Sequence, residues 1–156
     1  MSFRLTLAAV AMTALAGICL SPLAASAQSA EDAVKARIAL MDGFDEHAKV
    51  LLASSKAGTA DAATAKAAEE ISAGLKKLIG LFPAGSGSDK FKSRAKPEIW
   101  ADFAKFEGYA KDTDAAFVAV AAAAKAGDGA GVTAAFTKAA ASCNVCHREY
   151  RGPRQQ

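Results

Sequence analysis

A helical spacing of apolar side chains recurs in four segments of the 156-residue chain, and it limits the fold more than any other feature. The segments lie at about residues 31–54, 61–79, 97–124 and, starting between 128 and 132, up to 151. Turn residues separate them, namely Gly58, Gly80 with Pro83, and Gly127. Because each segment has one apolar face to bury, the pattern predicts an all-α, antiparallel four-helix bundle. The loop at residues 83–96 is its least regular connection.

Composition and charge are typical of a helical protein and argue against nucleic-acid binding and catalysis. Aromatic residues make up only 7% of a chain that is rich in alanine, the strongest helix former. The net charge of +3 is spread along the chain, so we predict no nucleic-acid partner. The carboxylates are scattered over helix ends and polar faces, where solvation explains them. They form no acid–base pair, and we predict that the protein is not an enzyme.

The N-terminus has the layout of a secretory signal peptide. Arg4 precedes an apolar run at residues 5–20, and Pro22 and the small residues 25–27 follow. The alternative is a membrane anchor, but about 16 apolar residues are short for a membrane span. We therefore predict a cleaved signal at residues 1–27, a mature domain at residues 28–156 without a membrane anchor, and a periplasmic location.

The sharpest motif is Cys143-Asn-Val-Cys146-His147, the C-x-x-C-H attachment signature of c-type haem. Residues at i, i+3 and i+4 share one face of a helix. The two thiols can therefore add to the vinyl groups of one porphyrin while the imidazole reaches the iron. The motif predicts one covalent haem c, attached at Cys143 and Cys146, with His147 as the proximal iron ligand.

Two other kinds of site use the same residue types. A thiol–disulfide oxidoreductase has a C-x-x-C pair, but it expects a βαβ context and a cysteine at a helix N-terminus. A zinc site needs four ligands, and His47 is the only other histidine of the chain. Both remain alternatives to haem.

The surroundings of the motif resemble the class II cytochromes c, the cytochrome c-prime family. The likeness rests on Cys143-x-x-Cys146-His147-x-x-Tyr150-Arg151 at the C-terminus, on Gly127-Asp128, and on Lys-Pro-Glu-Ile-Trp at residues 96–100. It extends over essentially the whole mature length, whereas class I cytochromes c have the motif near the N-terminus. The resemblance implies a four-helix bundle with one haem near its C-terminus.

The resemblance also points to a sixth iron ligand. The first helix crosses the distal haem face in this family, and its low-spin branch, exemplified by cytochrome c-556, supplies a methionine. Arg37-x-x-x-Met41 resembles that arrangement, and Met41 is the only methionine of residues 28–156. Alternatively, Met41 simply fills the core. His47 lies about 120° away around the helix and has no predicted role.

Further haem contacts follow from the same resemblance. Arg37 and Arg151 could each bind a haem propionate, and Trp100 corresponds to a tryptophan at the haem edge. Phe44 would wall the distal pocket and Tyr150 the proximal pocket. The alternative for Arg37 and Arg151 is a solvated surface arginine, and the alternative for Trp100 is a core aromatic residue.

These features lead first to a periplasmic monohaem electron carrier with low-spin iron bound by His147 and Met41. The alternative is a five-coordinate haem protein of the cytochrome c-prime type that binds nitric oxide or carbon monoxide. We expect redox proteins of the periplasm as partners. A homodimer through the first two helices could also form.

Overall fold

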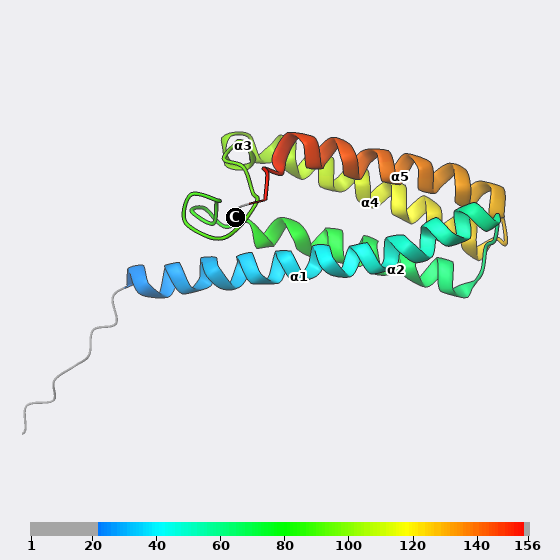
Figure 1. Ribbon diagram of the computed structural model, residues 1–156, viewed down its shortest axis with the longest axis horizontal. Helices are drawn as coiled ribbons and strands as arrows, with labels where there is room; N and C mark the ends of the chain where they lie inside the picture. Colours follow the sequence, from blue (N-terminus) through cyan, green and yellow to red (C-terminus); the bar gives the residue numbers. More distant parts are fainter. Residues whose placement is uncertain (1–21, 155–156) are drawn as a thin grey trace, which may run out of the picture.

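Four long helices run antiparallel in the computed structural model, which describes residues 22–154 (Figure 1). The predicted four-helix bundle is confirmed, and the described residues contain no strand beyond one isolated bridge between Ala95 and Arg151. In chain order the elements are α1 (Pro22–Ala57), α2 (Ala62–Leu78), the 3₁₀ turn η1 (Ile79–Leu81), α3 (Glu98–Ala101), α4 (Phe103–Lys125) and α5 (Gly129–Tyr150).

Two short connections join α1 to α2 and α4 to α5. In each of them a glycine ends one helix and an aspartate caps the next. Gly58 and Gly127 have φ angles of 65° and 71°, a left-handed conformation that glycine adopts without strain. Asp61 then accepts a hydrogen bond from Thr64 N at 2.7 Å, and Asp128 accepts one from Gly131 N at 2.8 Å. These N-caps begin α2 and α5 where the sequence predicted helix starts.

The third predicted helix is interrupted, which the apolar spacing did not indicate. Asp102 has φ −142° and ψ 77°, so the short α3 ends there and α4 begins. The side chain of Asp102 accepts a hydrogen bond from Lys105 N at 3.0 Å. An aspartate that caps a new helix competes with continuation of the old one, and here the cap prevails.

The first helix differs from its prediction in two ways. It begins at Pro22 rather than Glu31, so residues 22–27 of the predicted signal form its first turns, while residues 1–21 lie outside the described part. Ile38, an apolar residue in the helical spacing of the predicted segment 31–54, is 45% exposed, whereas Arg37 is only 4% exposed. Arg37 takes the inward position because hydrogen-bond acceptors of a loop face it there.

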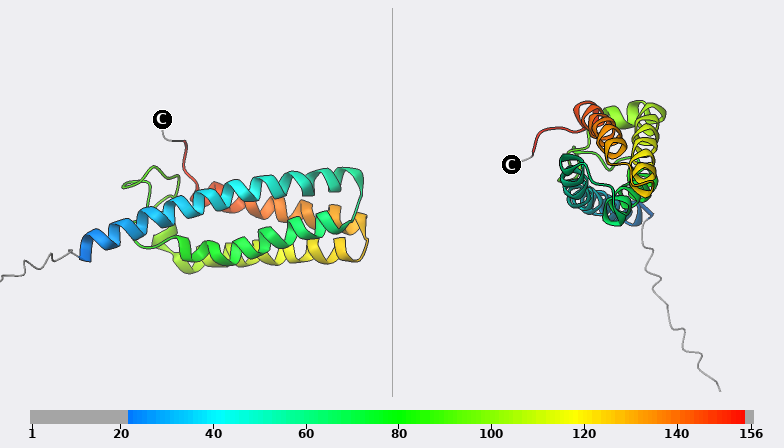
Figure 2. Two further views of the ribbon diagram at one scale, coloured as in Figure 1. Left: turned by 90° about the horizontal axis from the view of Figure 1, so that it is seen from below. Right: turned by 90° about the vertical axis from the view of Figure 1, so that its right-hand side faces the viewer.

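The four long helices surround a common axis in the end-on view (Figure 2), and one apolar core of buried side chains joins them. Its fully buried side chains come from every long helix and from α3, and include Leu51, Ile71, Ile99, Val120 and Val132. Within residues 22–154, no helix is both long and apolar enough to cross a membrane.

The connection between η1 and α3, residues 82–97, folds back onto one end of the bundle (Figure 2). We call it the crossing loop. Lys96 N donates to Tyr150 O at 3.0 Å, and Gly152 N donates to Arg94 O at 2.7 Å. The crossing loop is therefore fastened to the C-terminal end of α5, where the C-x-x-C-H motif lies.

Candidate haem site

The motif occupies the last two turns of α5. Cys143, Cys146 and His147 are all half-buried, and both thiols are free. The two cysteines pack against the apolar core of the bundle. Helical spacing directs all three side chains to one side of α5, as attachment to one porphyrin edge requires.

The thiols do not have the character of redox-active cysteines. Burial raises the pKa of Cys143, and burial together with the neighbouring Cys143 raises the pKa of Cys146 to about 11. A reactive thiol needs the opposite shift, toward thiolate at neutral pH. The raised pKa values therefore argue against thiol–disulfide exchange.

A metal site made only of protein ligands also lacks support. Among the residues that the structure describes, no group of three or more His, Cys, Asp and Glu side chains could hold a metal ion. A structural zinc site requires four such ligands. The donor set instead fits a porphyrin, which supplies its own four nitrogen ligands and needs only thioether bonds and an axial ligand from the chain.

Charged side chains from three segments change the pKa of His147. Burial lowers its pKa most, the positive charges of Arg151 and Arg94 lower it further, and the carboxylate of Asp45 raises it. Asp45 belongs to α1 and Arg94 to the crossing loop. Sequence analysis identified neither residue, because the loop has no periodic pattern and Asp45 falls outside the apolar stripe of its helix.

Met41 lies one turn before Asp45 on α1. Its side chain is half-buried and packs against the same core as Cys143 and Cys146. This position is compatible with the distal side of a haem bound at the motif, and ligation by Met41 stays a prediction. His47 is half-buried further along α1.

Arg37 has protein partners for its guanidinium group. Its Nη atoms donate to Leu81 O at 3.1 Å, Ser86 Oγ at 2.8 Å and Ser93 Oγ at 2.7 Å, and also to Ser86 O. A haem propionate would therefore compete with acceptors in η1 and in the crossing loop. The propionate contact remains a prediction.

The three aromatic residues predicted to contact haem lie in two places. Phe44 lies against α2, whereas Trp100 and Tyr150 lie beside the crossing loop. The Phe44 ring packs so closely on α2 that a Cβ atom added at Gly74 would lie 2.7 Å from Phe44 Cζ. Trp100 Nε1 donates to Phe82 O at 3.0 Å, which ties α3 to the crossing loop. Tyr150 is buried at an edge-to-face angle to Phe106, with ring centroids 5.2 Å apart. Their contacts with haem stay predictions.

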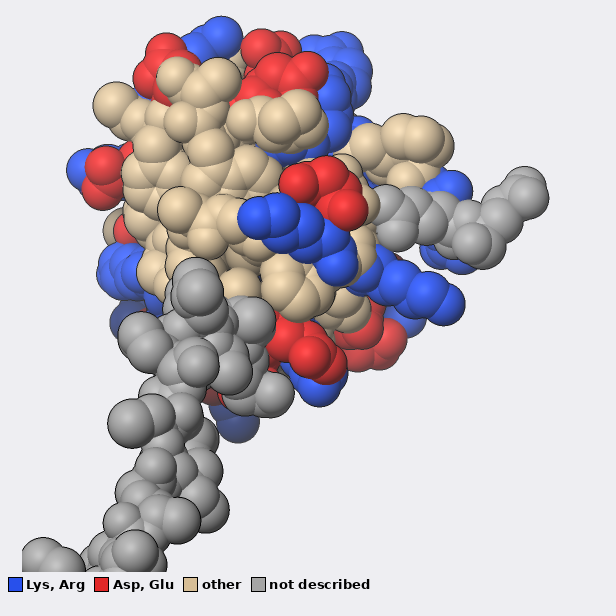
Figure 3. Space-filling view, turned by 90° about the vertical axis from the view of Figure 1, so that its left-hand side faces the viewer, with Lys and Arg blue, Asp and Glu red and all other residues tan. Residues whose placement is uncertain are grey.

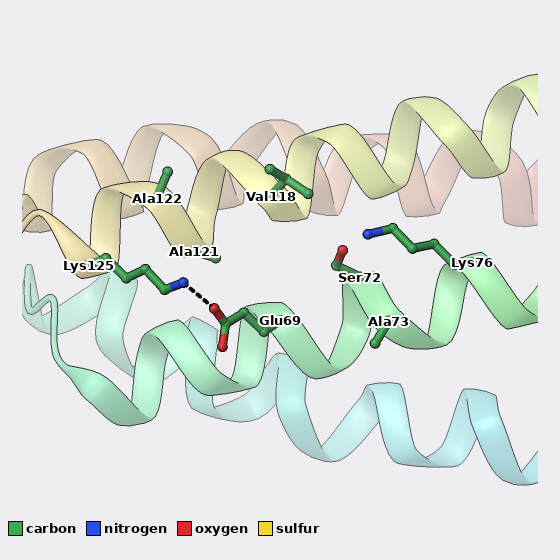
Figure 4. Close-up of a pocket in the computed structure, with 8 residues that line it drawn as sticks. All are labelled: Glu69, Ser72, Ala73, Lys76, Val118, Ala121, Ala122 and Lys125. Atoms are coloured by element: carbon green, nitrogen blue, oxygen red, sulfur yellow. Dashed lines mark ion pairs between the residues drawn. The ribbon is translucent and has the colours of Figure 1, made fainter.

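Arg151 is exposed just beyond α5, and its main chain pairs with Ala95. Positive and negative side chains are interspersed on this end of the molecule (Figure 3). The groove between α2 and α4 is a separate feature, with an ion pair between Lys125 and Glu69 across it (Figure 4). None of its lining residues belongs to the motif or the crossing loop.

Comparison with known proteins gives consistent results. The family model for Cytochrome C' matches residues 32–151. A cytochrome c' of Alcaligenes xylosoxydans xylosoxydans is 41% identical over 91 residues, which are 58% of this chain and 69% of that protein. A cytochrome c-556 of Agrobacterium tumefaciens is 40% identical over 92 residues, with coverages of 58% and 72%.

The fold comparison agrees. The crystal structure of cytochrome c' from Thermochromatium tepidum matches with a TM-score of 0.71 at 25% identity, and covers 80% of this chain and 97% of that one. The family match extends from residue 32, within α1, to Arg151, beyond the C-x-x-C-H motif. The chain therefore belongs to the cytochrome c' family, whose members carry one covalently bound haem c with its iron.

Proposed function

We propose that the protein is a haem protein of the cytochrome c' type that binds a small gas, nitric oxide or carbon monoxide, at the sixth position of its iron. Cys143 and Cys146 attach the haem, and His147 holds the iron on the proximal side. The observation that carries this proposal is the free, half-buried Cys–Cys–His set on one face of α5, in a chain that the family model matches over residues 32–151. The role is binding, and we assign no catalytic residue.

The haem would supply an iron that changes oxidation state and binds diatomic gases. Residues of the chain would make His147 a suitable ligand for this iron. Burial and the charges of Arg151 and Arg94 lower the pKa of His147, which keeps the imidazole neutral at pH 7, the form that binds iron. Because Cys143 and Cys146 pack against the core, they would hold the attached edge of the haem beside apolar side chains.

The electron carrier with iron bound by His147 and Met41 is the second candidate. It is favoured by the half-buried position of Met41 on α1 and by the likeness to a cytochrome c-556. Sequence analysis predicted the electron carrier first and the gas-binding protein as its alternative. The family model and the cytochrome c' relatives favour the gas-binding type, so we place it second. A thioether bond to iron is weak enough for a gas to displace it.

Visible spectra of the oxidised and reduced holoprotein test both functions. A high-spin ferric spectrum and a carbon monoxide adduct of the ferrous protein are expected, with no change in Met41→Leu. A low-spin ferric spectrum with a methionine-to-iron charge-transfer band, converted to high spin by Met41→Leu, would establish the second candidate instead. Purified protein without covalent haem would contradict both.

We also propose that residues 1–27 direct export to the periplasm, where c-type haem is attached and where partner redox proteins reside. The motif supports this location, because thiol attachment of haem needs an exported chain. Mass spectrometry of the purified protein is expected to give an N-terminus at Gln28. A mature protein that retains residues 1–27 would contradict it.

A homodimer through α1 and α2 is our proposal for the quaternary state. Among the side chains described at residues 29–154, three of the four large exposed apolar ones belong to α1, namely Ile38, Val50 and Leu52, and the fourth is Val118 on α4. Sedimentation equilibrium is expected to show a dimer that Leu52→Glu dissociates and that Val118→Glu leaves intact. A monomeric parent protein would refute the dimer.

A further inference from the structure

Arg37 is a charged side chain held almost entirely inside the protein. It is 4% exposed, and its two Nη atoms donate to four acceptors on Leu81, Ser86 and Ser93. The guanidinium carbon also lies 4.5 Å from the ring centroid of Phe82. One residue of α1 therefore holds the start, the middle and the far part of the crossing loop.

Burying the charge of Arg37 costs free energy, because the guanidinium loses its hydration. Burial lowers the pKa of Arg37 to about 10, and no Asp or Glu of the described residues forms an ion pair with it. Four hydrogen bonds to the protein replace the hydration that the buried guanidinium loses. The planar guanidinium donates from two separate Nη atoms in fixed directions, whereas an ammonium group is a compact point charge on a single nitrogen.

The loop that Arg37 holds continues to the motif through hydrogen bonds. Ser93 Oγ accepts from Ala95 N at 3.1 Å, in addition to its bond from Arg37. On either side of Ala95, Lys96 N donates to Tyr150 O and Gly152 N donates to Arg94 O. Arg151 N then donates to His147 O at 3.0 Å. A continuous path leads from α1 to the main chain of His147.

We propose that Arg37 is a positioning residue that couples α1 to the motif end of α5 through the crossing loop. By holding Ser86 and Ser93, it fixes the loop strand that pairs with residues 150–152 and so orients His147 toward the iron. Met41 lies one turn beyond Arg37, so the same contact sets the position of the distal helix turn. This inference rests on the proposed function, since it concerns the residue that would hold the iron.

Hydrogen exchange of the holoprotein tests the first half of the coupling. Arg37→Lys keeps the charge but loses the fork, and Lys35→Gln is the matched control, because Lys35 is exposed on the same helix. In Arg37→Lys, amides 84–96 and 150–152 are expected to exchange about tenfold faster, while those of α2 and α4 keep their parent rates. Exchange at the parent rate in the loop, or an equal rise throughout the bundle, would overturn the proposal.

Resonance Raman spectra of the ferrous protein test the second half. The Fe–His147 stretching band is expected to shift or broaden in Arg37→Lys and to stay unchanged in Lys35→Gln. Faster loop exchange with an unaltered band overturns the coupling. If Arg37→Lys does not accumulate, Ser93→Ala removes one acceptor and is expected to give the same local pattern with a smaller amplitude; its absence overturns the proposal.

The two proposals fail separately. A parent protein without covalent haem would refute the proposed function, and the exchange data on the same protein and variants would still decide whether Arg37 holds the crossing loop to residues 150–152.

Discussion

Arg94 and Gly152 exchange two hydrogen bonds of 2.7 Å although 58 positions separate them. Gly152 N donates to Arg94 O, and Arg94 Nε donates to Gly152 O. The pair joins the crossing loop, which contains Arg94, to the chain just beyond α5, which contains Gly152. It also brings the charge of Arg94 close enough to His147 to lower the pKa of the imidazole.

Replacing Arg94 should therefore loosen this end. We expect Arg94→Ala to reduce the free energy of unfolding by about 1 kcal/mol, since it removes one charge-assisted hydrogen bond from a half-buried site. Urea unfolding monitored by circular dichroism measures the change. Lys92→Ala, at an exposed position of the same loop, is the control and should stay within about 0.5 kcal/mol of the parent. Equal losses in the two variants would contradict the role of the Arg94–Gly152 pair.

The two cysteines should determine whether haem remains bound to denatured protein. We expect acidified acetone to extract all haem from the double variant Cys143→Ala/Cys146→Ala and none from the parent, because thioether bonds survive denaturation. Haem absorbance in the protein and solvent fractions is the measurement. Ser142→Ala, on the same turn of α5, is the control and should retain its haem. Haem that stays with the double variant would show attachment at another residue.

Gly74 marks a close approach of α1 to α2. A Cβ atom there would lie 2.7 Å from Phe44 Cζ and 3.0 Å from Leu40 Cδ1. We expect Gly74→Ala to destabilise the protein by about 1–2 kcal/mol, because overpacking outweighs the gain in helix propensity. Gly43→Ala is the matched control in α1, with nothing within 4 Å of the added carbon, and should stabilise by up to about 1 kcal/mol. Thermal unfolding compares the two, and a stabilised Gly74→Ala would contradict this packing.

Asp61 provides a prediction on pH. Hydrogen bonds from the main chain and side chain of Thr64 lower the pKa of the Asp61 carboxyl below its usual value of 3.8. A carboxyl with a lowered pKa in the folded state stabilises the protein above its unfolded pKa, and this stabilisation disappears as the pH falls through the folded pKa.

Asp61→Ala is thus expected to lower the thermal midpoint by a few degrees at neutral pH, because α2 loses its N-cap. The difference from the parent should shrink as the pH falls below about 4, where both chains lack the charged cap. Asp112→Ala, at an exposed position within α4, should show a smaller difference at neutral pH. A difference between Asp61→Ala and the parent that is constant with pH would contradict a charged cap.

Local sequence signals identified most of the fold and the centre of the site. Helical spacing and turn residues predicted α2, α5 and the two short connections, because these depend on contacts within a few residues. They failed at Asp102, where a side chain that caps a helix ended the preceding one, and at Ile38, where a neighbouring arginine faces inward. Neither outcome can be deduced from apolar spacing, since both depend on which competing hydrogen bond forms.

The sequence by itself determined that this chain makes an α-helical bundle and that Cys143, Cys146 and His147 share one helical face, because residues at i, i+3 and i+4 always do. Only the tertiary structure decided what surrounds that face. Arg94 and Asp45 act on His147, and Arg37 holds Ser86 and Ser93, across 49 and 56 positions of chain in the case of Arg37. Such contacts depend on how the crossing loop folds back, and no local pattern encodes that path.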